Sequence, residues 1–417
     1  MKKYQSLNTS LNWQDFLPHL VDEKMVLLNH PNTDFVLGWE VEDVVTLQKH
    51  TFSVDSLQSF IRNHQHEFLF GYLSYDLLNN EMRGKLSDDK NLEVDTLFLF
   101  VPKHVIIQKA GQAIYFGELN PLEIKSLIVK FQHSETNEFL SEEIDLKTEI
   151  SQDEYIQNVN AIKNEIQNGT IYEMNYCVQF NANYKHLNLS NTYKKLVALS
   201  QAPFAAFVND GINTVLCASP ERFLKKKQQT LISQPIKGTA KRGKNKHEDD
   251  VILENLTTDP KEISENVMIV DLVRNDLSKV ATKNSVKVTE LCEPYSFKTV
   301  HQLISTVQCE LKPEKTFSEI LQALFPMGSM TGAPKISSME QIHRFENFNR
   351  GIYSGAIGYI DPNGNFDFNV VIRSIIVHQK AKQVTCSVGG AITINSIPKK
   401  EYEECLLKLN AVKKTLC

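Results

Sequence analysis

The sequence has no long apolar run. Its longest apolar stretches, residues 68–73 and 370–377, are short and are interrupted by glycine or arginine, far below the roughly 20 residues needed to cross a bilayer. The first residues also lack the apolar segment of about 7–15 residues that a secretory signal needs. We therefore expect a chain that is mature as written, lies in the cytoplasm and has no membrane partner.

Paired cysteines and an excess of one charge are missing as well. The seven cysteines form no CxxC pair and no metal-ligand spacing, which is typical of reduced, buried thiols. The 45 basic residues are balanced by 50 acidic ones, giving a net charge of −5. Nucleic acids and anionic membranes attract a clustered basic excess, so we expect neither as a partner.

The chain does contain enough apolar material for a large core. It has 417 residues, of which 41% are hydrophobic and 23% charged, as in a soluble enzyme made of one elaborate domain or two joined closely. Residues 1–132 alternate strand-like runs with turns, and the acidic segment 133–149 is typical of a solvated connection. We place a soft boundary in this segment, between an N-terminal region, 1–132, and a second region, 150–417.

Local patterns predict both helices and strands along the chain. Helices are expected at 151–168, 260–273, 316–325 and 401–416, and strands at 24–28, 96–101, 104–109, 231–236, 366–377 and 383–388.

Two of these helices carry pairs of carboxylates. Glu262 and Glu265 stand at i and i+3 on one helix, and Glu401 and Glu404 repeat the spacing on another, with Lys408 one turn further on. Two such pairs brought together would suit Mg²⁺, which prefers oxygen ligands and an anionic substrate group. Each pair taken alone also fits a solvated helix face, and spacing alone does not decide between the two interpretations.

Lys237 lies at the end of a strand, beside Gly238. If it is desolvated or near a cation, its pKa would fall and the neutral amine would be a nucleophile. A surface lysine before a turn fits the local sequence too. Upstream, Glu221 ends another strand and is either a general acid or the partner of Arg222 in a surface ion pair.

Other segments have two interpretations each. Arg373 lies in an apolar run, so it either pairs with a protein carboxylate or waits for an anionic ligand. The turn 326–335 could cradle a carboxylate, although it is not a Walker loop. Taken alone, His301 reads as an ordinary buried histidine, 389–390 as a bulge or turn, and 270–277 as a structural ion-pair network.

The order of these segments along the chain resembles the chorismate-utilising enzymes, a family that includes anthranilate, isochorismate, salicylate and aminodeoxychorismate synthases. The motifs that carry the resemblance are SPERF, PIKGT, KEISENVMIVDLVRNDL, VHQLIS, GSMTGAPK, YSGAIGY, FNVVIRS, VGGAI and EYEE, with FGYLSYD in the N-terminal region. The resemblance implies an α+β fold in which two large antiparallel sheets pack together with helices outside, and an active site between them.

The resemblance also implies roles for individual residues. Glu265 and Glu404 would hold Mg²⁺ on the ring carboxylate of chorismate, supported by Glu262 and Glu401. The other implied substrate contacts are Arg373 and Tyr353 for the enolpyruvyl carboxylate, Ser329, Gly389, Gly390 and Lys408 for the rest of the molecule, Thr239 beside the ring, and His301 as the active-site histidine.

Within this family, lysine after Pro-Ile is usual in the members that make 4-amino-4-deoxychorismate, and alanine in the others. Lys237 therefore implies attack of its amine on C2 of chorismate while Glu221 protonates the departing 4-hydroxyl. Ammonia then adds at C4 and releases the lysine, which yields the precursor of 4-aminobenzoate and folate. The alternative is anthranilate synthase component I, although no Leu-Leu-Glu-Ser feedback motif is found near the N-terminus.

Some positions depart from the family pattern. Glu173 replaces the glutamine usual in ammonia-using members and the lysine that activates water in isochorismate-type enzymes, and a carboxylate there could act as a base. Asn266 stands where histidine is commoner, and Ala240-Lys241 where Arg-Pro is usual. None of these changes removes a proposed catalytic group.

The family motifs extend from the first hundred residues to Glu404, which leaves no room for a fused glutaminase domain. No cysteine lies in a Gly-x-Cys-x-Gly setting. We therefore expect ammonia to come from a separate glutamine amidotransferase subunit.

Overall fold

A computed structural model describes residues 2–7, 9–30, 34–47, 53–78, 96–134, 139 and 141–417 of the chain. Within these residues, no helix combines the length and the apolar character needed to cross a membrane.

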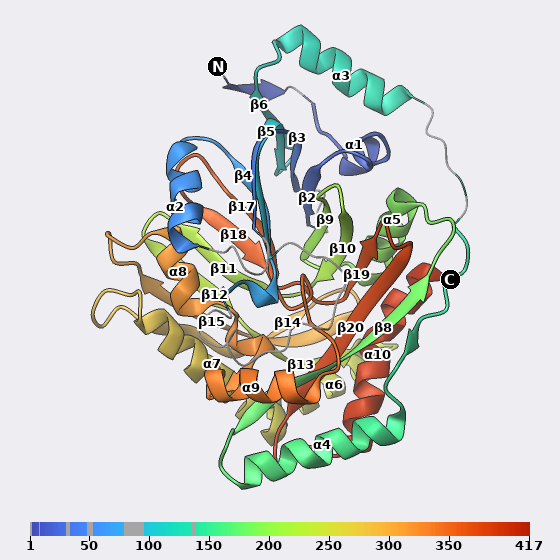
Figure 1. Cartoon of the computed structure of the whole chain (residues 1–417), viewed down its shortest axis with the longest axis vertical. Helices are drawn as coiled ribbons and strands as arrows, with labels where there is room; N and C mark the ends of the chain where they lie inside the picture. The colour runs from blue at the N-terminus through green and yellow to red at the C-terminus, as the bar shows by residue number, and fades with distance from the viewer. Residues whose placement is uncertain are drawn as a thin grey trace.

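Groups of strands are separated by helices along the chain (Figure 1). The strands are β1 (Lys3–Leu7), β2 (Met25–Asn29), β3 (Phe35–Leu47), β4 (Leu69–Leu73), β5 (Leu97–Lys109), β6 (Gln112–Gly117), β7 (Lys147–Thr148), β8 (Glu173–Asn183), β9 (Phe204–Asn209), β10 (Asn213–Ser219), β11 (Arg222–Lys227), β12 (Thr230–Gln234), β13 (Ile236–Lys241), β14 (Lys287–Ser296), β15 (Val300–Glu310), β16 (Gly332–Ala333), β17 (Ala356–Ile360), β18 (Phe366–Asn369), β19 (Ser374–His378) and β20 (Gln383–Ile392). The α-helices are α1 (Trp13–Leu20), α2 (Val54–Asn63), α3 (Pro121–His133), α4 (Gln152–Gln167), α5 (Leu189–Ser200), α6 (Lys246–Thr258), α7 (Pro260–Ser278), α8 (Phe317–Leu324), α9 (Lys335–Phe345) and α10 (Pro398–Leu416).

The strands form one antiparallel network with two limbs that meet at β5. One limb continues from β5 through β3, β2, β9, β10, β19 and β20 to β8. The other continues through β4, β17, β18, β11 and β12 to β15, which also pairs with β13 and β14. The predicted α+β class with two large antiparallel sheets is confirmed, and β5 joins the two sheets by hydrogen bonds.

Alternating side chains on the first limb enter two different apolar cores. Val26 and Val208 belong to the core that also contains residues of the second limb, whereas Met25 and Phe207 belong to the core beneath the outer helices. This is the period-two pattern of a strand that is covered on both faces. The first limb is therefore the middle layer of the molecule.

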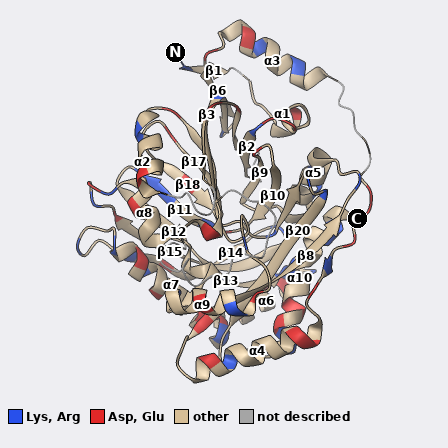
Figure 2. Cartoon of the chain, viewed as in Figure 1, with Lys and Arg blue, Asp and Glu red and all other residues tan. Residues whose placement is uncertain are grey.

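Helices cover the outer faces (Figure 1). Helix α10 packs against β20, α4 and α5, while α7 packs against β13, β14 and β15. Lys, Arg, Asp and Glu residues are concentrated on the outer helices, and few lie on the strands in the middle (Figure 2). The two acidic helices predicted from the sequence, α7 and α10, thus flank β13, which contains Lys237, and β20, which contains Gly390.

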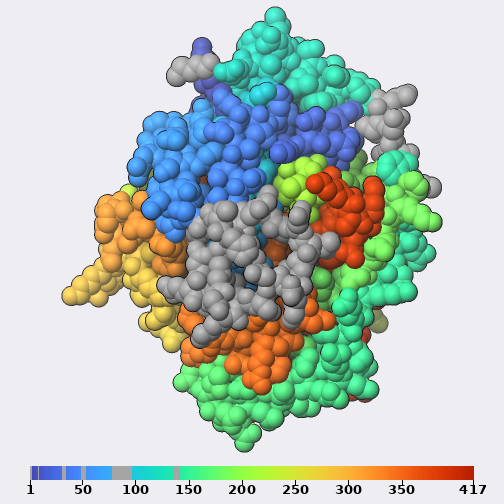
Figure 3. Space-filling model, viewed as in Figure 1, coloured from blue at the N-terminus to red at the C-terminus, as the bar shows by residue number. Residues whose placement is uncertain are grey.

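Segments far apart in the sequence lie together. Strand β4 pairs with β17, and β2 pairs with β9, while the Ser318 hydroxyl on α8 donates to Gln58 on α2 over 3.2 Å. In the space-filling view the blue N-terminal residues accordingly adjoin the orange α8 (Figure 3). Part of the predicted connection at 133–149, residues 135–138 and 140, lies outside the described residues, and the boundary there stays a prediction.

Several predicted bounds were wrong. The strands expected at 96–101 and 104–109 are one strand, β5, and the strand expected at 366–377 is divided into β18 and β19. The helix expected at 260–273 extends to Ser278, and the strand expected to end before the glycine pair continues to Ile392.

Candidate active site

Lys237 lies in a bulge of β13. The register against β15 shifts between Ile236 and Thr239, and Gly238 within the bulge has φ +85°, a conformation that favours glycine. A side chain at Gly238 would also stand 3.1 Å from Glu262 Oε2. The bulge buries the lysine side chain, and its Nζ lies 3.1 Å from Glu173 Oε1 on β8.

Carboxylates surround the Lys237 ammonium. Burial alone would lower its pKa, but the negative charges of Glu173, Glu265 and Glu221 outweigh burial and hold the pKa of Lys237 above its ordinary value. The resting side chain is therefore the charged ammonium. The lowered pKa that the sequence allowed for Lys237 is thus not found. A base has to remove a proton from the Lys237 ammonium before its nitrogen can attack.

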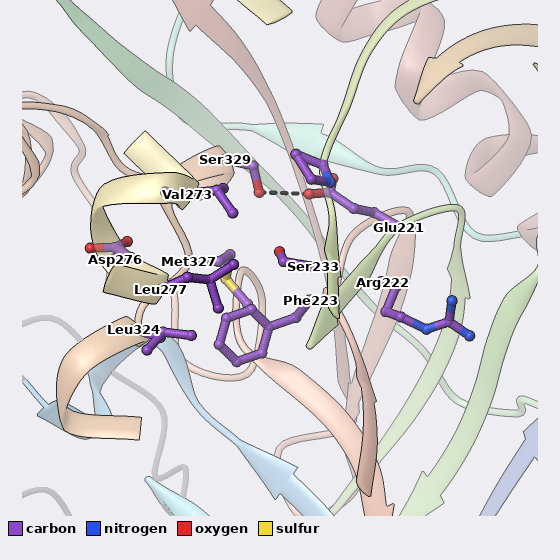
Figure 4. A pocket seen from close by; sticks show the side chains of 12 residues that line it. Glu221, Arg222, Phe223, Ser233, Val273, Asp276, Leu277, Leu324, Met327 and Ser329 are labelled. Carbon is purple, nitrogen blue, oxygen red and sulfur yellow. Dashed lines mark hydrogen bonds between the residues drawn. The ribbon is translucent and has the colours of Figure 1, made fainter. Parts of the chain in front are cut away.

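Glu221 lies in the turn between β10 and β11 and is buried. Burial raises its pKa to about 7, against the lowering effects of the Ser329 hydrogen bond and of Lys237 and Arg373. The Ser329 hydroxyl donates to Glu221 Oε1 over 2.7 Å, as the dashed line in Figure 4 shows. A carboxyl group that is still protonated near neutral pH is suited to general acid chemistry. The alternative, a surface pair with Arg222, is wrong, because Arg222 pairs with Asp367 at 2.8 Å.

A small pocket adjoins this carboxyl (Figure 4). Apolar side chains, among them Phe223, Leu277 and Met327, line most of it, and Glu221 and Ser329 lie at its border. This apolar wall is the physical reason that the Glu221 carboxyl resists ionisation.

Arg373 precedes β19 with φ +52°. Among the described residues its guanidinium has no hydrogen bond or ion pair, and burial lowers its pKa while the charge of Glu221 opposes that shift. A buried guanidinium is costly without an anion. Of the two interpretations that the sequence left open, pairing with a protein carboxylate is not seen among the described contacts.

The two acidic helices meet at a lysine that the sequence did not single out. Lys261 Nζ lies 3.7 Å from Glu265 Oε1 on its own helix and 3.4 Å from Glu401 Oε1 on α10. Burial lowers the pKa of Lys261, but Glu401 and Glu265 outweigh it and the pKa is raised. The only sequence signal was the i,i+4 spacing of Lys261 and Glu265, which normally marks a surface pair.

Glu404 and the glycine pair lie beside this cluster. Burial would raise the pKa of Glu404, but the ammonium of Lys408 at 2.8 Å outweighs burial and lowers the pKa. Lys408 also donates to the backbone carbonyl of Gly389 over 2.8 Å. A side chain at Gly390 would lie 3.7 Å from Glu401 and 3.9 Å from Glu404, so glycine keeps the space in front of the acidic helices open.

The acidic helices contain one buried carboxylate oxygen that has no hydrogen bond among the described residues. Among the residues that the structure describes, no three carboxylates converge with metal-ligand geometry, because their oxygens are arranged around Lys261. Glu265 Oε1, however, is buried without a hydrogen bond, and burial raises the pKa of Glu265 to about 7. A buried carboxylate oxygen that lacks a donor is suited to bind Mg²⁺.

Three predicted residues make their contacts elsewhere. His301 is buried between Asp249 and Ser296, at 2.9 and 2.8 Å from its two ring nitrogens. Thr239 accepts a hydrogen bond from Gln302 over 3.3 Å, and the Tyr353 hydroxyl lies 3.6 Å from Cys177 Sγ. No described contact joins any of them to Lys237, Glu221 or the acidic helices, so their roles stay predictions.

The predicted ion-pair network at 270–277 is present. Asp276 pairs with Lys279 at 2.8 Å and with the buried Lys335 at 2.5 Å. A second buried pair, Glu346 and Arg350 at 2.7 Å, was not predicted from the sequence. Its i,i+4 spacing was visible but does not distinguish a buried pair from an exposed one.

Comparison with known proteins identifies the family. Residues 21–414 match the family described as chorismate binding enzyme. The chain belongs to the chorismate-binding enzyme family. It is 40% identical over 264 residues to an aminodeoxychorismate synthase of Arabidopsis thaliana, and 35% identical over 266 residues to aminodeoxychorismate synthase component 1 of Bacillus subtilis. It is also 33% identical over 347 residues to an anthranilate synthase component I-like protein of Synechocystis.

The chain and these relatives overlap to different extents. The alignments cover 63%, 64% and 82% of the chain, and 28%, 56% and 71% of the Arabidopsis, Bacillus and Synechocystis proteins. A probable aminodeoxychorismate synthase of Oryza sativa is also similar, and the chain spans only 30% of its length, compared with 28% of the length of the Arabidopsis protein.

Solved structures show the same fold. Anthranilate synthase component I of Streptococcus pneumoniae has a TM-score of 0.76 at 22% identity, covering 100% of this chain and 92% of that one. The menaquinone-specific isochorismate synthase of Escherichia coli has a TM-score of 0.79 at 18% identity, covering 100% and 94%.

Proposed function

We propose that this member of the family is an aminodeoxychorismate synthase, an enzyme that converts chorismate and ammonia into 4-amino-4-deoxychorismate. One observation carries the proposal. A single buried site contains both the Lys237 ammonium, which carboxylates surround, and the Glu221 carboxyl, whose pKa is raised. The names and the 35–40% identities of the similar synthases support it.

The proposed reaction has two displacement steps. The Lys237 nitrogen forms a bond to C2, the ring double bonds shift, and the 4-hydroxyl leaves as water with the proton of Glu221. Ammonia then forms a bond to C4, the double bonds shift back, and the lysine nitrogen departs with its bonding electrons. Arg373 is the proposed partner of the enolpyruvyl carboxylate, because its guanidinium is unpaired among the described residues.

We propose Glu265 and Glu404 as Mg²⁺ ligands, with Glu262 and Glu401 in support. When bound, Mg²⁺ would neutralise the ring carboxylate of chorismate. Of these four residues, Glu401 and Glu404 lie beside Gly390, 3.7 and 3.9 Å from the position of a Cβ there.

The proposal extends to the physiological setting. The nitrogen would come from a separate glutamine amidotransferase subunit, and the product would serve 4-aminobenzoate and folate synthesis in the cytoplasm. The component 1 designation of the Bacillus relative fits an enzyme that works with a second component.

A product assay tests the proposal. The purified chain is incubated with chorismate, Mg²⁺ and ammonium, and the products are separated and identified by mass. The expected product is 4-amino-4-deoxychorismate, which yields 4-aminobenzoate only after a lyase is added. Anthranilate fluorescence without a lyase would instead establish the second candidate, anthranilate synthase component I, which the 31–33% identities to proteins of that name favour.

A further inference from the structure

Glu173 is fixed at the start of β8. Its backbone pairs with Ala333 of β16, and its carbonyl accepts the Ser338 hydroxyl over 3.0 Å. The residue is 1% exposed, so bulk water does not reach its carboxylate. Oε1 lies 3.1 Å from Lys237 Nζ, whereas Oε2 has no hydrogen-bond partner among the described residues.

The other carboxylates around Lys237 have described contacts with other residues and no described hydrogen bond with the Lys237 ammonium. Glu221 accepts the Ser329 hydroxyl, and Glu265 has Lys261 as its ion-pair partner. Arg373 is a cation and cannot accept a proton. In the described part of the site, Glu173 is therefore the only carboxylate in hydrogen-bond contact with the Lys237 ammonium.

We propose that Glu173 is the catalytic base that removes the proton from Lys237 before attack on chorismate and returns it when the lysine is released. The inference rests on the proposed function. It gives a chemical reason for a carboxylate at this position, because an amide has the same shape but cannot hold the proton.

The protons and electrons balance. Lys237 ammonium and Glu173 carboxylate become neutral amine and carboxylic acid, and the amine lone pair forms the bond to C2. The C4–O bond breaks, and Glu221 supplies the proton for water. Ammonium then gives one proton to the Glu221 carboxylate and attacks C4 as ammonia. The lysine leaves as a neutral amine and recovers its proton from Glu173.

A purely structural ion pair makes a different prediction. A buried pair is by itself weak evidence of function, and removal of one partner is destabilising in any case. Such a role would reduce stability, and loss of the Glu173 charge would lower the pKa of Lys237, so that more neutral amine is present at pH 7 and adduct formation is not slowed there. A base role changes how the rate of the first step depends on pH.

The experiment measures formation of the Lys237 adduct on rapid mixing with chorismate and Mg²⁺, without ammonium, by intact-protein mass from pH 6 to pH 9. The expected mass increase equals chorismate less one water. The variants are Glu173→Gln, which keeps the shape, and Glu173→Asp, which keeps the acid. Glu346→Gln is the matched control, since it removes another buried carboxylate from its ion pair with Arg350.

In Glu173→Gln we expect adduct formation at pH 7 to slow by about 10²–10⁴, and the deficit relative to the wild type to shrink as pH rises and solvent takes the proton. Glu173→Asp should recover part of the rate, and Glu346→Gln should lower the melting temperature without altering the pH profile. An unchanged rate in Glu173→Gln, or a deficit that is the same at every pH, would overturn the base role. Absence of an adduct in the wild type would instead overturn the proposed function.

Discussion

At the scale of single residues, burial of Glu221 sets the pH range of the proposed chemistry. Its pKa is raised to about 7, so the carboxyl is protonated below that value and loses its acidic proton above it. We expect kcat/KM for chorismate to fall as pH rises through about 7. Glu221→Gln should lower kcat by about 10²–10⁴ and abolish this part of the pH profile. Wild-type turnover in that variant would exclude Glu221 as the acid.

Arg373 gives a second prediction at this scale, in which binding and stability change in opposite directions. Loss of a charge-assisted hydrogen bond costs about 1.5–3 kcal/mol, so Arg373→Met should raise KM for chorismate about 10- to 100-fold. Because the variant removes a buried cation that has no partner among the described residues, its melting temperature should not fall.

Arg222→Met is the matched control for Arg373, since Arg222 is paired with Asp367. It should lower the melting temperature and leave KM unchanged. A drop in stability with unaltered KM in Arg373→Met would show that its guanidinium has a structural role instead.

The sequence predicted which residues carry the proposed chemistry, but not their protonation states. The family resemblance implied the roles of Lys237 and Glu221, but the end of a strand expected at Lys237 was wrong, because Lys237 lies inside β13. Their protonation depends on Glu173, Glu265 and Ser329, which come from other elements and whose proximity only the folded chain creates. The same holds for Lys261, whose partner Glu401 lies 140 positions away.

At the scale of elements, helix caps were predictable because they are local. Ser151 accepts the Glu154 amide, and Asp259 accepts the Lys261 and Glu262 amides, as their types suggest. The strands were less predictable. The two strands expected at 96–101 and 104–109 lie on either side of Pro102. They form the single strand β5, in which Pro102 stands opposite Val41, next to a bulge in β3, where a proline is tolerated.

The division of the strand expected at 366–377 also has a long-range cause. The amide of Val370 donates to the carbonyl of Glu221, and the amide of Val371 donates to Gly355. These bonds draw the chain out of the ladder just before Arg373. The break between β18 and β19, which positions Arg373, thus depends on Glu221 and Gly355. A local sequence pattern around residues 366–377 does not include them.

Lys261 joins helices α7 and α10, and this joint gives a prediction at the element scale. In Lys261→Met the carboxylates of Glu265 and Glu401 lose their shared cation and repel each other. We expect a lower melting temperature than the wild type in a chelator, and a larger increase on addition of Mg²⁺, followed by differential scanning fluorimetry.

Lys279→Met is the control for Lys261, because it removes a lysine from the same helix, paired there with Asp276. Its response to Mg²⁺ should equal that of the wild type. If Lys261→Met also responds like the wild type, the acidic helices do not form the divalent-cation site.

At the scale of the whole molecule, both tryptophans report on a core built from the two ends of the chain. Trp13 and Trp39 lie in the same apolar cluster as Leu409 of α10. Strands β2 and β4 of the N-terminal region also pair with β9 and β17 of the second region. The two predicted regions should therefore unfold together, although long chains often unfold in separate steps.

Leu409→Ala tests this coupling, because it removes a core side chain from the second region while both tryptophans lie in the first. Removal of a fully buried leucine side chain costs about 2–5 kcal/mol, and urea unfolding followed by tryptophan fluorescence and by far-UV circular dichroism should shift to one lower midpoint. Leu407→Ala, two residues away but 51% exposed, should change the free energy of unfolding by no more than about 0.5 kcal/mol. An unchanged fluorescence midpoint with a lower dichroism midpoint would mean that residues 1–132 unfold on their own. The pairings of β2 with β9 and of β4 with β17 would then not couple the stability of the first region to that of the second.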